Sequence, residues 1–179
     1  SRSARQVRLA AKCTGAAAAV EFALIAPVLI LMYFGVAELT QGLICQRRVA
    51  HTADTIGDLV AQGSTTSQAE MSDIMTVGQT ILAPFPTAPL DMRVSSITES
   101  AQGVTTVDWS FASGMTTLAK GAVVAPPSTA ISPGQSVIMS EVQYAYTSPV
   151  HYVMPQITNF AYVYYLHPRV SDSVTCSDC

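Results

Sequence analysis

The stretch TGAAAAVEFALIAPVLILMYFGVAEL, Thr14–Leu39, decides the fold of this chain. From Ala16 to Ala37 it contains 22 residues with Glu21 as the only charge. As a helix this segment would measure about 33 Å, close to the roughly 30 Å of a bilayer's hydrocarbon layer. In a secretory signal peptide small residues follow a shorter apolar run, whereas here they precede it. We therefore predict a membrane-spanning helix that anchors the protein.

The distribution of charge predicts how this helix is oriented. Only 12% of the 179 residues are charged, against about a quarter in typical soluble domains. Four of the nine basic residues lie in the first twelve positions, where no acidic residue occurs: Arg2, Arg5, Arg8 and Lys12. The positive-inside rule then places the N-terminus in the cytoplasm and the chain from Glu38 onward outside. The remainder of the chain is acidic, which argues against a nucleic-acid partner.

Glu21 is the unusual residue of the span. An ionisable group inside a membrane is costly, and by default it indicates a function that requires a partner. The nearest cation, Lys12, lies more than two helical turns away. Cutting the chain just before Glu21 would create an α-amino group, mostly protonated below a pKa near 8. That group would be strained against Glu21 in the same chain but accessible from a staggered neighbour. The alternative is an interfacial carboxylate that reaches the lipid headgroups.

The segment GAAAAVEFALIAP, Gly15–Pro27, resembles the N-terminal signature of TadE/TadG-like pseudopilins of tight-adherence (Tad, Flp-type) pilus systems. The resemblance implies a type IVb-like minor pilin whose basic leader is removed by a membrane prepilin peptidase. It also implies that Glu21, Phe22 and Pro27 belong to the assembly segment. Two later stretches resemble the family's late strand and C-terminal ending: VIMSEVQYAYTSPV (137–150) and YLHPRVSDSVTC (165–176).

The processing site departs from the family pattern by one residue. The conserved Glu is normally the fifth residue of the mature chain, but cleavage after Gly15 would make Glu21 the sixth. Cleavage between Ala16 and Ala17 restores the fifth position, and we favour that bond. The chain could also remain uncut as an anchored protein.

The rest of the chain predicts an α+β head. Apolar residues continue with helical spacing through Gln41–Gln62, and Ser67 is a suitable N-cap for a second helix over Gln68–Leu82. The proline-rich segment Ala83–Pro89 ends that helix. Four strand-like runs follow, which predict an antiparallel sheet that packs on the first helix. They are Met92–Thr98, Thr105–Ala112, Ser136–Tyr146 and Phe160–His167, and in the second of them Val107, Trp109 and Phe111 are expected to share a face.

The sequence offers little for catalysis or metal binding. His51, His151 and His167 lack metal-ligand neighbours at a convincing spacing, and no known nucleophile, phosphate-loop or metalloprotease motif occurs. We therefore predict no enzyme, no cofactor and no metal.

The cysteines predict a structural disulfide. Cys45, Cys176 and Cys179 lie beyond the span, where an oxidising periplasm would favour such a bond. The pairing could be Cys176–Cys179 or Cys45 with either of them, and the sequence does not distinguish these.

Together these features predict a minor pseudopilin in the bacterial inner membrane, with a cytoplasmic N-terminus and a periplasmic head. Its expected partners are other pilins, the prepilin peptidase, the inner-membrane assembly platform and the lipid bilayer. An uncleaved periplasmic scaffold of the pilus secretion apparatus is the alternative. The predicted segments are a leader (1–16), a transmembrane helix (17–39), a helical stem (40–62) and an α+β head (63–179).

Overall fold

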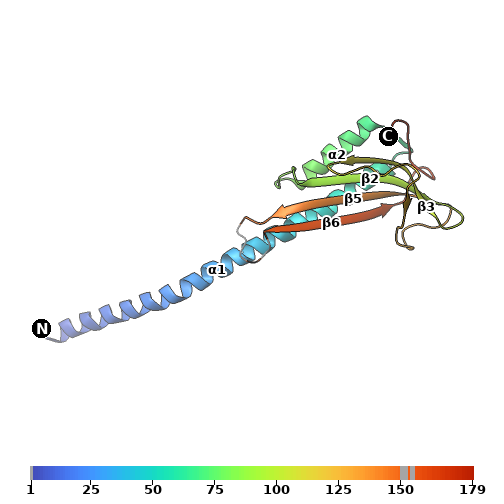
Figure 1. Cartoon of the computed structure of the whole chain (residues 1–179). Helices are drawn as coiled ribbons and strands as arrows, with labels where there is room; N and C mark the ends of the chain where they lie inside the picture. The colour runs from blue at the N-terminus through green and yellow to red at the C-terminus, as the bar shows by residue number, and fades with distance from the viewer. Residues whose placement is uncertain (1, 150–152, 154–155) are drawn as a thin grey trace.

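One continuous helix dominates the fold. The computed structural model describes residues 2–149, 153 and 156–179, with the side chains of the first helix described from Ala17 onward. Helix α1 (Arg2–Ala61) contains Pro27 without interruption, and at about 1.5 Å per residue it measures roughly 90 Å. Its outer half projects away from the head, while its inner half lies along the sheet (Figure 1). The predicted span and stem are therefore parts of a single helix.

Helix α2 (Gln68–Leu82) forms with the predicted boundaries. Its N-cap is Ser67, whose hydroxyl oxygen accepts a hydrogen bond from the backbone N–H of Glu70 at 3.3 Å. The helix buries Met71, Met75 and Leu82 in the head. It ends before the proline-rich segment, as expected for residues that cannot continue a helix.

The head contains a five-stranded antiparallel sheet in the order β4-β3-β2-β5-β6. The strands are β2 (Leu90–Glu99), β3 (Thr105–Ser113), β4 (Val123–Val124), β5 (Ser136–Thr147) and β6 (Ile157–Leu166). A small parallel pair joins β1 (Thr65–Thr66) to β7 (Thr175–Cys176). The four predicted strands and the α+β class are confirmed, whereas the two-residue strands are too short to leave a pattern in the sequence.

The two faces of the sheet bury different clusters. One face packs on α1 and α2 through a large core that includes Val49, Ala53, Ile56, Ile138 and Val142. The other face carries a smaller cluster partly covered by the connection between β3 and β5: Ile97, Val107, Ile131, Val137 and Met139. Successive residues of β5 alternate between these clusters, as the period of two in a strand requires.

A β-bulge changes the predicted facing of β3. The β2–β3 register shifts between Ser96 and Ile97, which leaves Asp108 as an extra residue. Its carboxylate accepts hydrogen bonds from the Ser96 and Thr98 hydroxyls at 3.1 and 2.7 Å. Trp109 therefore joins the helix-side core, whereas Val107 joins the opposite cluster. The prediction that these two residues share a face is wrong because sequence alternation does not reveal a bulge.

Candidate functional site

The segment of α1 over residues 17–37, whose only charged residue is Glu21, is apolar on all sides. Its exposed large hydrophobic residues are Val20, Phe22, Leu24, Ile25, Val28, Leu29, Ile30, Leu31, Met32, Tyr33, Phe34 and Val36. A helix that is hydrophobic all round is buried in lipid or among other helices. By length and composition, α1 from residue 17 onward contains a segment suited to crossing a membrane.

Glu21 lies on this apolar helix and is exposed. Its neighbours Val20 and Phe22 are 60% and 70% exposed. Within the part of the chain whose side chains are described, no residue forms an ion pair or hydrogen bond with Glu21. The described residues of the head therefore supply no partner for this carboxylate.

The predicted processing residues lie one turn before Glu21. Gly15 and Ala16 belong to the helical backbone of α1, but their side chains lie outside the described part. Ala17 is the first residue whose side chain is described, and it is exposed. The expected cleavage bond thus lies in the outer half, away from the folded head (Figure 1).

A second carboxylate on the same helix has the opposite environment. Glu38 is only 1% exposed. It accepts a hydrogen bond from the hydroxyl of Ser148 and another, at 2.8 Å, from the backbone N–H of Val153. Both donors belong to the connection between β5 and β6. Glu38 therefore fastens that connection to α1 at the edge of the apolar segment.

In the sequence, Glu38 marks only the end of the span. A signal for its role exists in the spacing Gly35, Glu38, Gly42 and Cys45, which places these residues on one helical face. All four are buried. At Gly35 a Cβ atom would lie 3.2 Å from a methyl group of Val153, so the small residue allows the connection to approach the helix.

The inner half of α1 is held closely against the sheet. The Ser140 hydroxyl donates a buried hydrogen bond to the backbone carbonyl of Ala53 at 2.7 Å. A Cβ atom at Gly57 would lie 2.5 Å from Leu166 Cδ1 and 2.9 Å from Ser140 Cβ, so only glycine fits this approach. Helix and sheet therefore form one packed unit.

The cysteines occupy two separate places. Cys45 is a buried free thiol in the helix-side core, and burial raises its pKa to about 11. Burial also raises the pKa of Tyr144, in the same core, to about 12. Cys176 and Cys179 are joined by a disulfide at the end of the chain. Of the pairings that the sequence left open, the structure contains the short-range one.

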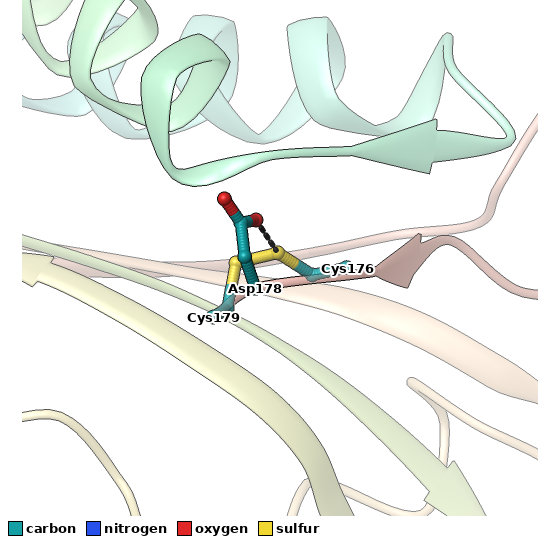
Figure 2. Close-up of side chains that lie close together, drawn as sticks. All are labelled: Cys176, Asp178 and Cys179. Atoms are coloured by element: carbon teal, nitrogen blue, oxygen red, sulfur yellow. Dashed lines mark hydrogen bonds between the residues drawn. A yellow bond between two sulfur atoms is a disulfide. The ribbon is translucent and has the colours of Figure 1, made fainter.

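Figure 2 shows Asp178 beside this disulfide. Its Oδ1 lies 3.6 Å from Cys176 Sγ, and the ligand atoms of Cys176, Asp178 and Cys179 lie within 4.8 Å of one another. Disulfide sulfurs are not thiolates, so this cluster lacks the ligands that a metal would need. Asp178 instead accepts hydrogen bonds from Gln68: the backbone N–H donates to Oδ1 at 3.0 Å and the side-chain amide to the backbone carbonyl at 2.7 Å. The cluster fastens the C-terminal tail to the start of α2.

The histidines show no common site. His51 and His167 are exposed, and His151 lies outside the described residues. His51 Nδ1 lies 3.4 Å from the Thr55 hydroxyl, one turn along α1. Within the described ranges, neither exposed histidine belongs to a group of metal-ligating side chains.

These features define a class: a single-pass membrane protein whose N-terminal helix is half apolar anchor and half core of an α+β head. Residues 16–57 match the family model described as "TadE-like protein", which confirms the resemblance seen in the sequence. The match spans Glu21 and Glu38 and ends at Gly57, which packs against the sheet. It points to a structural protein associated with a Tad pilus. Comparison with curated proteins and with solved structures yields no match.

Proposed function

We propose that this protein is a minor pseudopilin of a Tad-type pilus. Residues 1–16 form a cytoplasmic leader, which a prepilin peptidase removes at the Ala16–Ala17 bond. The segment 17–39 crosses the inner membrane, and residues 40–62 and 63–179 form the periplasmic stem and head. The observation that supports this best is Glu21, an exposed carboxylate on an apolar helical segment, for which the described residues of the head offer no partner.

The proposed assembly step uses the cost of that carboxylate. A charge in a helix bundle is strongly unfavourable without a paired opposite charge. Cleavage before Ala17 creates an ammonium group four residues from Glu21, which is about 6 Å along the helix axis. A neighbouring chain shifted by about that distance brings its new N-terminus level with Glu21. This displacement between neighbouring chains is therefore favoured, because it pairs the Glu21 carboxylate with the neighbour's ammonium group.

The geometry of such contacts produces a fibre. Each subunit receives an ammonium group at Glu21 and presents its own to the next, so the two contacting surfaces differ. Head-to-tail contacts that do not close into a ring extend into a filament. The assembly platform would add each subunit from the membrane, with Phe22 and Pro27 in the packed helical segment.

Two measurements test the proposal in cells that form these pili. Intact-mass analysis of the membrane-extracted protein should show loss of the segment up to Ala16. Glu21→Gln should still insert and be cleaved but should abolish assembly, whereas Glu21→Asp, which keeps the charge, should retain part of it. Normal piliation with Glu21→Gln would rule out the pairing mechanism. An intact leader in piliated cells would instead favour the uncleaved periplasmic scaffold.

A further inference from the structure

A cationic groove lies where α1 meets the end of α2. It has a volume of about 510 Å³ and is lined by Ile44, Arg47, Arg48, His51, Thr80 and Ile81. Two of these residues are permanently charged arginines, and none is acidic. The groove is therefore suited to an anion that also has an apolar part.

The side chains of the groove are partly fixed and partly available. Arg48 Nη1 donates a hydrogen bond to the carbonyl of Ile81 at 2.9 Å, which orients the guanidinium across the groove and leaves its other donors available. Arg47 and His51 are exposed beside it. Arginine donors match the paired oxygens of a phosphate group, so phosphate is the anion that this arrangement favours.

The groove also faces the membrane end of the head. Helix α2 runs back along α1, so Ile81 at its end lies toward the projecting outer half (Figure 1). The exposed side chains of Leu39, Leu43 and Ile44 continue the apolar surface of the span up to the groove.

The height of the groove fits the lipid phosphates. Arg47 follows Ala37 by ten residues, which is about 15 Å along the helix. Side chains on a helix lean toward its N-terminus, here toward the membrane, and arginine extends its charged head to the interface. The headgroup region occupies about 5–8 Å on each side of the hydrocarbon, and a tilt of about 20° lowers the groove further. The Arg47 guanidinium therefore lies within reach of this layer.

We propose that this groove binds the phosphate of an anionic phospholipid in the outer leaflet, with its acyl chains against Leu43 and Ile44. Binding there fixes the height and rotation of the subunit in the membrane before assembly. The proposal rests on the topology of the proposed function, in which α1 spans the membrane and the head lies outside, but it does not depend on cleavage or on the pairing of Glu21.

The test uses the full chain in nanodiscs containing equal parts of phosphatidylcholine and phosphatidylglycerol. Native mass spectrometry then counts the lipids that each variant retains. We expect wild type to retain phosphatidylglycerol preferentially. Arg47→Gln should lower this preference about fivefold, since each basic residue near an anionic surface contributes about that factor. Arg47→Lys should keep most of the preference for phosphatidylglycerol. Lys120→Gln, which removes an exposed charge elsewhere on the head, should leave this preference unchanged.

Arg47 is the informative position because Arg48 also supports α2, so a change there can act through folding. Adding excess inorganic phosphate separates a lipid site from a site for free phosphate. Retention that is unaffected by inorganic phosphate supports the lipid, and loss of phosphatidylglycerol under that condition overturns the assignment. Equal retention of both lipids, or no response to Arg47→Gln, also overturns it.

Discussion

Helix α1 carries two glutamates, one in each half, and the two differ in almost every respect. Glu21, in the outer half, is exposed and has no partner among the described side chains. Glu38, in the inner half, is buried and accepts hydrogen bonds from Ser148 and Val153. The chain thus satisfies one charge within its own fold and leaves the other to be satisfied elsewhere.

This difference separates folding from assembly along a single helix. Buried polar groups are hydrogen-bonded in native proteins because leaving them unpaired is costly. Glu38 follows that rule within the subunit. For Glu21 the same rule predicts a partner from outside the chain, since membrane and apolar neighbours provide none. Four changes test whether the inner half of α1 contributes to the stability of the head while the outer half does not.

The largest effect is expected for Glu38→Ala. Removing the carboxylate leaves the Ser148 hydroxyl and the Val153 N–H without this acceptor, which should lower the free energy of unfolding of the head by about 3 kcal/mol. Chemical denaturation in micelles, followed through the single tryptophan Trp109, measures this loss. Glu21→Ala is the matched control and should change it by less than about 0.5 kcal/mol. Equal losses for the two variants would contradict the comparison.

The second effect concerns the reactivity of Cys45. Burial raises its thiol pKa from 9.0 to about 11, so at pH 8 the thiolate is about a hundredfold scarcer than for an ordinary thiol. A fourth cysteine, Cys13 in the predicted leader, is replaced by serine in both proteins compared. Alkylation of folded protein by iodoacetamide at Cys45 should then be slower by at least about this factor than alkylation of the exposed variant Asp54→Cys with Cys45→Ser.

The sign of the pH dependence follows from the same shift. The fold favours the protonated thiol, so its contribution to stability is complete below pH 9 and is lost as the pH rises toward about 11.

In denaturant without reductant, Cys45 should label fully while Cys176 and Cys179 do not. A Cys45 that labels only after reduction would show that it pairs with the tail instead.

A smaller effect is expected for Gly57→Ala. The added Cβ atom would overlap Leu166 and Ser140, and overpacking of this kind costs about 2 kcal/mol. Ala23→Val adds methyl groups to the exposed outer half and should leave head unfolding unchanged. A similar denaturation midpoint for Gly57→Ala and wild type would indicate that α1 shifts away from the sheet without loss.

The smallest effect is expected at the C-terminal tail. Replacing Cys176 and Cys179 by serine opens a very short loop, for which we expect a loss of about 1 kcal/mol or less. The Trp109 indole N–H donates to the carbonyl of Val174 at 2.7 Å, so its emission should shift slightly if the tail loosens. Unfolding of the whole head on reduction would show that the tail contributes far more than its contacts suggest.

Much of the fold follows from local patterns. The apolar run, the Ser67 cap and the proline-rich stop define both helices because each depends on neighbours within one or two turns. Alternation identifies β2, β3, β5 and β6 for the same reason. The β1–β7 pair and the Asp108 bulge depend on distant segments meeting, and a two-residue strand or a single extra residue does not change the pattern enough to be seen.

The two carboxylates show the same limit at the candidate site. Glu21 is conspicuous because its surroundings in the sequence are apolar. Glu38 is inconspicuous because its partners lie more than a hundred residues away, on the β5–β6 connection. The sequence shows that Gly35, Gly42 and Cys45 share a helical face with Glu38, but it does not show that the β5–β6 connection packs there. The sequence does not reveal the groove at Arg47 and Arg48 for the same reason, since Ile81 joins it only through the antiparallel course of α2.

Because α1 is one continuous helix, the orientation of the head is coupled to that of the membrane segment. Because the segment between Glu21 and Glu38 is helical throughout, inserting one residue there would turn the head by about 100° and lift it by about 1.5 Å relative to the anchor. The direction in which the head faces its surroundings is therefore encoded by the number of residues in the bilayer segment.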